Sequence, residues 1–203
     1  MSSEIVKRPY RLKARAERQQ DTRRRIAAAM AGLHEEVGPA RTTIAEVARR
    51  AGVQRPTVYN NFPAERDLHA ACQGHFLAEH PPPDPRLALA LADPGERVRA
   101  ALESLYDWYR STEAMTGNVQ RDRRLVPELD ALLAQTADRR YDELARELAR
   151  GLRRRGRAAT HLRALIRLAL EFATWQRLAS EGLTDAEAAR LMARAAIGDP
   201  LDE

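Results

Sequence analysis

The sequence predicts an all-α protein, with a small N-terminal helix-turn-helix domain of three helices followed by a larger C-terminal helical bundle. Three observations support this fold class. Alanine, leucine, arginine and glutamate, which favour helices, are abundant, whereas aromatic residues make up only 5% of the 203 residues. Apolar residues recur at spacings of three and four, and no segment shows the alternation expected of a half-buried strand. Prolines and glycines separate these segments, and the length suits either one medium domain or one small and one larger unit.

The first helix is expected over residues 21–37, because Ile26, Met30 and Leu33 form one apolar stripe. Gly38 and the proline after it end this helix. Residues 1–20 are expected to form a basic, flexible arm ahead of it. The arm carries six cationic side chains: Lys7, Arg8, Arg11, Lys13, Arg15 and Arg18.

Residues 43–62 predict two short helices joined by a tight turn. The first helix has apolar residues at i, i+3, i+4 and i+7: Ile44, Val47, Ala48 and Ala51. Gly52 follows, where a helix commonly ends in a left-handed residue, and Pro56 suits the first turn of the next helix. Val58 and Phe62 are four apart and face inward. Hydroxyl, amide and guanidinium groups are left on the outer face, as in helices that read the DNA major groove.

This segment reads T-I-A-E-V-A-R-R-A-G-V-Q-R-P-T-V-Y-N-N-F and resembles the DNA-binding domain of the TetR family of bacterial repressors. The family's pattern is roughly T-V-x-D-I-A-x-x-A-G-V-S-x-G-T-L-Y-x-H-F. With the flanking helices, the resemblance covers about residues 21–80. The sequence departs from the pattern at Ala45, where many members have arginine, at Gln54, where serine is usual, and at Glu65, where most have a phosphate-binding lysine. The resemblance implies a dimeric repressor that binds double-stranded DNA at a palindromic operator and responds to a small organic effector.

Within this interpretation, two sets of DNA-binding residues are expected. Base edges are assigned to Gln54, Arg55, Thr57 and Asn60, and phosphates to Thr42, Thr43, Tyr59, Asn61 and Arg66. Arg66 is the candidate to replace the phosphate contact missing at Glu65.

The distribution of charge agrees with a DNA-binding N-terminal domain. Residues 1–62 hold 13 Lys and Arg against 6 Asp and Glu, a net charge of +7, whereas residues 63–203 hold 21 against 23, a net charge of −2. The arm would follow the DNA backbone or enter a minor groove. An arm without fixed contacts, a solvated basic face and an anionic membrane surface are the alternatives for this charge.

A proline-rich break at residues 81–85 is expected to separate the two domains, so that residues 86–203 form the ligand-binding and dimerisation domain. Helices are expected at four places: residues 94–110, 127–155, 160–180 and 185–197. Residues 111–126 are expected to be irregular. Thr184 and Glu187 form a capping-box pattern at the start of the last helix.

The last two helices are expected to pair two copies of the chain, as the TetR resemblance implies. Their apolar stripes are two sets: Leu162, Leu165, Ile166, Ala169, Phe172, Ala173 and Gln176, and Leu183, Ala186, Ala189, Ala193, Ala196 and Ile197. Packing of these stripes within one chain is the alternative. The expected effector site is made of Tyr106, Tyr109, Glu113, Met115, Asn118, Phe172, Trp175 and Gln176. Plain core packing of its aromatic residues is the alternative there.

Other chemistry is not indicated. A further helix is expected between Pro63 and Pro81, and its histidines His69, His75 and His80 are six and five residues apart, so they do not share a face that would hold a metal ion. One cysteine, Cys72, allows no internal disulfide. No phosphate-binding loop or nucleophile motif occurs, so neither a cofactor nor enzymatic activity is expected. The lack of a long apolar run or a signal-peptide core predicts a cytoplasmic protein without a membrane partner.

Two other functions would fit parts of the pattern. A helical ligand-binding protein or enzyme could use the helix-turn-helix only as scaffold, and it would show no DNA preference. A DNA-packaging protein would bind DNA without sequence preference and with strong salt dependence.

Overall fold

The computed structural model describes residues 7–152 and 154–198, and every regular element in this part is a helix, which confirms the all-α prediction. The chain folds as two compact units. The first combines Met1–Pro81 with Arg121–Leu132, and the second combines Pro82–Gln120 with Leu133–Glu203. The division after Pro81 falls inside the proline-rich break, but no sequence pattern predicts that residues 121–132 pack with the first unit.

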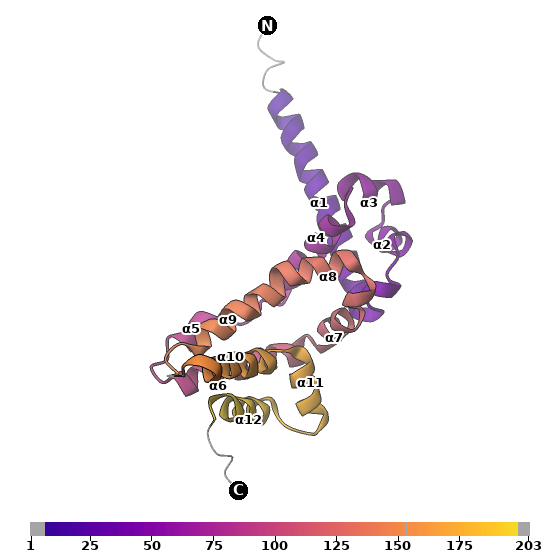
Figure 1. Cartoon of the computed structure of the whole chain (residues 1–203). Helices are drawn as coiled ribbons and strands as arrows, with labels where there is room; N and C mark the ends of the chain where they lie inside the picture. The colour runs from indigo at the N-terminus through magenta and orange to yellow at the C-terminus, as the bar shows by residue number, and fades with distance from the viewer. Residues whose placement is uncertain (1–6, 153, 199–203) are drawn as a thin grey trace. The chain divides into compact units, whose positions relative to one another are not determined.

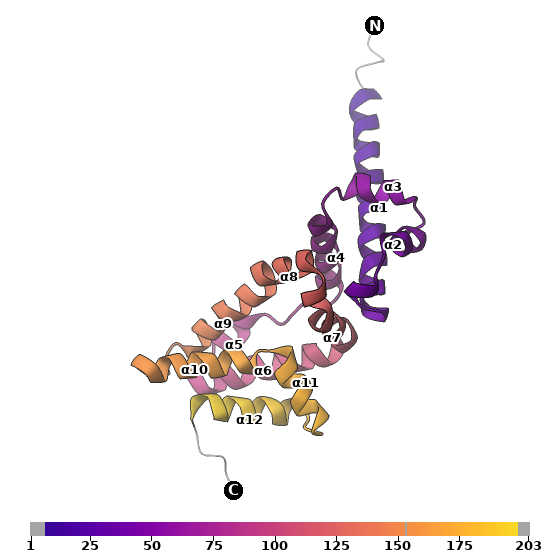
Figure 2. The same ribbon diagram turned by 45° about the vertical axis from the view of Figure 1, so that its right-hand side comes forward.

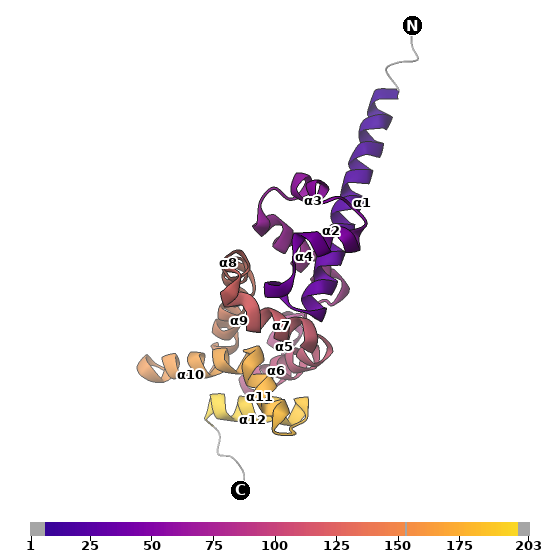
Figure 3. The same cartoon turned by 90° about the vertical axis from the view of Figure 1, so that its right-hand side faces the viewer.

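The first unit is built around one long helix, α1 (Lys7–Glu36), which packs against α2 (Ile44–Ala51), α3 (Arg55–Asn61) and α4 (Glu65–Glu79). These three helices lie beside the C-terminal half of α1, and its N-terminal part extends beyond them (Figure 1 and Figure 3). The buried side chains at the centre of the unit include Ile26, Met30, Val47, Val58 and Leu68.

The predicted start of the first helix at Asp21 was wrong, because α1 begins at Lys7. Pro9 lies in its first turn, where proline is tolerated, and the Lys, Arg, Ala, Glu and Gln residues that follow are strong helix formers. Residues 13 and 15–20 are exposed. The part of the predicted arm formed by residues 1–6 lies outside the described residues.

The remaining elements of the first unit are short. They are the 3-10 turns η1 (Pro39–Arg41) and η2 (Arg123–Leu125) and the helix α8 (Pro127–Leu133), whose last residue belongs to the second unit.

Residues 113–122 form α7 (Glu113–Asp122), so the expectation of an irregular stretch over residues 111–126 was wrong for most of its length. Gly117 and the asparagine after it lie inside this helix, where tertiary packing outweighs a weak helix propensity.

The second unit is a bundle in which α12 (Asp185–Ile197) lies alongside α6 (Pro94–Ser111) and α10 (Gly156–Ala169) (Figure 2). Four further helices belong to it: α5 (Pro85–Leu89), α7 as far as Gln120, α9 (Arg139–Ala149) and α11 (Phe172–Ser180). A π-helical turn, η3 (Ala134–Asp138), joins α8 to α9. The buried side chains of this bundle include Val98, Leu102, Leu148, Ile166 and Trp175.

Most helix starts and ends in this unit were predicted within one residue, but α10 begins at Gly156 rather than at residue 160. The side chain of Asp93 caps α6, and the capping box of Thr184 and Glu187 is present at α12. The helix expected to reach residue 155 ends at Ala149, because Arg150 is already extended, with φ −66° and ψ 133°. The helix expected over residues 160–180 is broken between α10 and α11. No helix in the described part of the chain is long and apolar enough to cross a membrane.

Candidate nucleic-acid interface

The two short helices of the first unit form a helix-turn-helix as predicted. On α2, Val47, Ala48 and Ala51 are buried. Gly52 is left-handed, with φ 65° and ψ 39°, and the amide of Val53 returns to the carbonyl of Ala48 at 2.9 Å. This hydrogen bond is the usual way of ending a helix at a glycine. It turns the chain directly into α3.

Arginines of α1 complete the C-terminal ends of both short helices. Arg25 donates to the carbonyl of Ala51 at 2.5 Å, at the end of α2. Arg23 donates to the carbonyl of Asn61, at the end of α3, and its guanidinium lies 4.0 Å from the centre of the Phe62 ring. The last carbonyls of a helix lack internal partners, and a cation there also suits the helix dipole. These two arginines therefore position the helix-turn-helix, a role that the count of basic residues did not reveal.

The outer face of α3 presents polar side chains that have no partner among the residues that the structure describes. Val58 and Phe62 are 1% and 3% exposed and hold the helix against the unit. The side chains of Gln54, Arg55, Tyr59 and Asn60 are exposed, and none makes a hydrogen bond or ion pair with another described residue. Thr57, also assigned to a base edge, is half-buried on the same helix. The donors and acceptors of this face are therefore available to a ligand such as DNA.

The residues assigned to phosphates differ in how far they are already engaged. The Thr43 hydroxyl oxygen accepts from the amide of Glu46 at 3.2 Å, which leaves its hydrogen available to a phosphate. The Thr42 hydroxyl donates to the carbonyl of Gly38 at 2.9 Å. The Asn61 amide donates to the carbonyl of Thr57 at 2.8 Å. Thr42 and Asn61 therefore stabilise the protein's own backbone, and a phosphate contact by either would replace or add to these bonds.

Arg66 is exposed in the first turn of α4, next to the exposed Glu65. The N-terminal residue of α4, Glu65, thus presents a carboxylate where the family pattern has a cation. Whether Arg66 replaces that contact stays a prediction.

A buried carboxylate that sequence reasoning missed holds the loop before α2. Asp122, at the end of α7, is 3% exposed and accepts a hydrogen bond from the amide of Ala40 at 3.1 Å. Arg121 donates to the same carboxylate at 2.7 and 3.0 Å. The Arg121 guanidinium and the Ala40 amide lower the pKa of the Asp122 carboxyl, although burial acts in the opposite direction. Asp122 is 82 residues from Ala40 in sequence, so no local pattern could have indicated this contact.

The residues expected to bind an effector separate into a buried and an exposed group. The buried group consists of Tyr106, Tyr109, Met115, Phe172 and Trp175. The ring centroids of Tyr109, Phe172 and Trp175 lie 5.2 to 5.8 Å apart. Glu113 and Gln176 are exposed, and Asn118 is half-buried. The structure therefore brings the aromatic residues together as packed core and leaves two of the polar candidates at the surface.

The polar atoms of this aromatic cluster are satisfied within the unit. Tyr106 donates to the carbonyl of Ala169 at 2.8 Å, and Tyr109 donates to the carbonyl of Leu170 at 2.7 Å. The indole of Trp175 donates to Asp185 at 2.8 Å. The two tyrosine hydroxyls donate to carbonyls at the end of α10, which would otherwise lack partners where the helix stops. These hydrogen bonds explain why the chain can break between α10 and α11 without a glycine or proline.

The apolar stripes proposed for dimerisation are largely internal. Ala189, Ala193 and Ala196 of α12 are at most 6% exposed and belong to the core of the second unit. On α10, Leu165 and Leu168 are instead 37% and 48% exposed. Any pairing surface on these helices would thus use the outer face of α10 rather than the alanine stripe.

The histidines and the cysteine of α4 form no metal site among the residues that the structure describes. His69 and Cys72 are buried, with 3% and 4% exposure, whereas His80 is exposed. Burial raises the pKa of the Cys72 thiol to about 12, so this side chain is a neutral thiol at pH 7.

Comparison with known proteins identifies the helix-turn-helix region. The model of a family described as bacterial regulatory proteins, tetR family, matches residues 26–72. An uncharacterized HTH-type transcriptional regulator of Mycobacterium tuberculosis H37Rv is 44% identical over 59 residues, which is 29% of this chain and 31% of that protein. The chain thus spans about a third of the length of this curated relative.

Two solved structures share the fold over most of the chain. A TetR-like transcriptional regulator from Rhodococcus sp. RHA1 has a TM-score of 0.57 at 19% identity, covering 86% of this chain and 93% of that one. RolR, solved in complex with resorcinol, has a TM-score of 0.50 at 21% identity, covering 90% and 89%. At such identities the likeness concerns the fold alone.

Proposed function

The chain belongs to the tetR family of bacterial regulatory proteins, and from this premise we propose that it is a repressor that binds a palindromic operator as a homodimer and leaves it when a small organic effector binds. Proteins of this family are transcription factors rather than enzymes. The observation that carries the DNA-binding proposal is the outer face of α3, where Gln54, Arg55, Tyr59 and Asn60 are exposed and have no side-chain partner in the described part of the chain.

In this proposal α3 enters the major groove. Gln54, Arg55, Thr57 and Asn60 meet base edges, because their amide, guanidinium and hydroxyl groups match the donor and acceptor pattern displayed there. Phosphates are bound by Tyr59 and Thr43 and, in a supporting role, by Thr42, Asn61 and Arg66. Phosphate contacts fix the register of the protein on the duplex but carry no sequence information.

A homodimer through residues 160–180 and 185–197, which include most of α10 together with α11 and α12, would present two such faces to the two halves of a palindrome. The exposed Leu165 and Leu168 on α10 support this part of the proposal, since a second copy would remove both side chains from water.

The effector is proposed to be an organic, moderately apolar molecule that enters the second unit beside the aromatic cluster of Tyr109, Phe172 and Trp175. The fold neighbour RolR was solved with resorcinol, an aromatic molecule of this kind. Release from DNA requires that the effector bind more tightly to a conformation that no longer fits the operator.

The direct test is fluorescence anisotropy with the purified protein and the DNA upstream of its own gene, against scrambled DNA, at two salt concentrations. Tight binding to the native site, weakening steeply with salt, supports a specific regulator. If the upstream DNA is not preferred, selection from random sequences should yield a palindromic site. Equal enrichment of all sequences would instead indicate a non-specific binder.

Two variants separate the proposed roles. Arg55→Ala should change which base is preferred at one position of the DNA site and should reduce the binding free energy by about 1–3 kcal/mol. The slope of log K against log salt should stay the same. Tyr59→Phe should weaken binding to all sequences alike. Arg146→Ala, an exposed arginine of the second unit, is the control and should alter neither property. An unchanged base preference in Arg55→Ala, with a shallower salt slope, would reassign that residue to a phosphate.

A further inference from the structure

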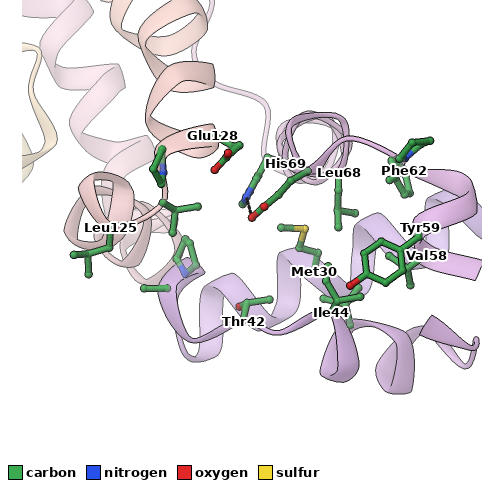
Figure 4. Close-up of a pocket in the computed structure, with 17 residues that line it drawn as sticks. Met30, Thr42, Ile44, Val58, Tyr59, Phe62, Leu68, His69, Leu125 and Glu128 are labelled. Atoms are coloured by element: carbon green, nitrogen blue, oxygen red, sulfur yellow. Dashed lines mark ion pairs between the residues drawn. The ribbon is translucent and has the colours of Figure 1, made fainter. Parts of the chain in front are cut away.

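The first unit contains a cavity of about 600 Å³ behind the helix-turn-helix (Figure 4). Its walls come from α1, the segment 39–47, α3, the start of α4 and residues 125–128. Twelve of the 17 residues that line it are apolar, among them Met30, Ile44, Val58 and Leu68. Two of its bordering side chains, Tyr59 and Leu125, are 56% and 71% exposed. This volume lies within the range of small-molecule sites.

A buried imidazole in this cavity lacks hydrogen bonds. His69 is 3% exposed, and neither of its ring nitrogens has a hydrogen-bond partner. The carboxylate of Glu65 is 3.6 Å from its Nε2, joined by the dashed line in Figure 4, which is too long for a hydrogen bond. Buried polar groups are almost always hydrogen-bonded, and an unmade bond costs about 1–3 kcal/mol. A neutral imidazole offers one donor and one acceptor to an occupant of the cavity.

The charged groups that line the cavity are negative. Glu65 from α4 and Glu128 from α8 both line it, and no lysine or arginine does so among the described residues. Burial lowers the pKa of His69, although Glu65 and Glu128 act in the opposite direction, so the imidazole is neutral at pH 7. The cavity thus combines an apolar body with two carboxylates and a neutral hydrogen-bond acceptor. An organic anion would be repelled, whereas a cation would be attracted.

We propose that this cavity is a binding site for a small organic ammonium ion, separate from the effector site of the second unit. The ammonium group would donate to His69 and pair with Glu65 and Glu128, while its apolar part would pack against Met30 and Leu68. Tyr59, itself proposed to contact DNA, borders the cavity, so an occupant would lie against the DNA-facing side of the unit.

The proposal is tested without DNA, by isothermal titration calorimetry of the full chain with benzylamine, phenethylamine and tryptamine at pH 7. Benzyl alcohol and benzoate are the neutral and anionic comparisons. At least one amine should bind at millimolar concentration, more tightly than the alcohol, and benzoate should not bind. Failure of all three amines, or equal binding of amine and alcohol, would overturn the proposal.

Variants locate the site. Two variants, Glu65→Gln and Glu128→Gln, each remove one negative charge from an exposed carboxylate, so both should fold. Each should weaken amine binding by about tenfold, which is equivalent to about 1.4 kcal/mol. Glu17→Gln makes the same change on α1 away from the cavity and should have no effect. In proton NMR, the imidazole resonance of His69 should shift on titration while that of His80 stays in place. Amine binding that neither cavity variant weakens would assign the ligand to another site.

Discussion

The contact between Asp122 and the amide of Ala40 should control the stability of the first unit. Asp122→Ala removes the acceptor of a hydrogen bond between two segments that are far apart in sequence. It also removes the carboxylate that binds Arg121. The site is nearly closed to water, because the Asp122 side chain is 4% exposed, so solvent cannot easily replace the lost partner.

The expected loss follows from the chemistry of the bond. A hydrogen bond to a charged group contributes about 1.5–3 kcal/mol, and leaving a buried donor unsatisfied costs a similar amount. We therefore expect Asp122→Ala to lower the free energy of unfolding by about 2 kcal/mol. Asp122→Asn retains an oxygen for the Ala40 amide but loses the charge, and about 1 kcal/mol is expected. Asp107→Ala, an exposed aspartate of α6, should stay within about 0.5 kcal/mol of the wild type.

Urea unfolding followed by circular dichroism measures these differences, and hydrogen exchange at the Ala40 amide reports on the bond itself. Exchange at that amide should accelerate in Asp122→Ala. The reasoning would be refuted by an Asp122→Ala variant that matches the Asp107→Ala control in stability and keeps the protection of Ala40.

Three further predictions concern other parts of the chain. Burial and the neighbouring His69 lower the pKa of His34 from 6.5 to about 4. As the pH falls, the unfolded chain therefore binds a proton at this histidine before the folded chain does. The free energy of unfolding, measured in urea, should keep its full value above pH 6.5 and be smaller by about 3 kcal/mol at pH 4. His34→Leu should flatten this slope, and an unaltered slope would assign it to other groups. Arg25→Ala should cost about 1 kcal/mol in the same assay by uncapping α2, whereas Arg24→Ala, which breaks only an exposed pair, should cost less than about 0.5 kcal/mol; equal losses would contradict the capping role. Leu168→Glu on α10 should convert the proposed dimer to a monomer in light scattering, while Leu87→Glu on α5, 77% exposed, should not; a dimeric Leu168→Glu variant would exclude that face.

Elements whose ends depend on nearby residues were predicted well. Gly52 ends α2 in the left-handed conformation, Asp93 caps α6, and Thr184 with Glu187 starts α12. Each of these signals acts over three or four residues, so the sequence displays it in full. The outer face of α3 was predictable for the same reason, because burial of Val58 and Phe62 determines which side chains of a short helix face outward.

Elements whose ends depend on distant residues were not predicted. The break between α10 and α11 has no glycine or proline, and the hydroxyls of Tyr106 and Tyr109, which satisfy the carbonyls there, lie more than 60 residues away. The assignment of residues 121–132 to the first unit has the same origin, since it involves Asp122 and the loop at Ala40. Hydroxyls and carboxylates that complete a distant helix end or loop look like ordinary polar residues in the sequence.

The same ambiguity affects the basic residues of the first unit, with a measurable consequence. An arginine that caps a helix and an arginine that binds a phosphate both donate to oxygen atoms, so composition cannot tell them apart. Arg23 and Arg25 donate to carbonyls of α3 and α2, and Arg50 pairs with Glu36 at 2.6 Å. Each phosphate neutralised by a cation changes the slope of log K against log salt by about −0.9. The number of basic residues in the segment 1–62 therefore overstates the salt dependence of DNA binding. If these three arginines are left out, the expected slope of log K against log salt becomes less steep by nearly three.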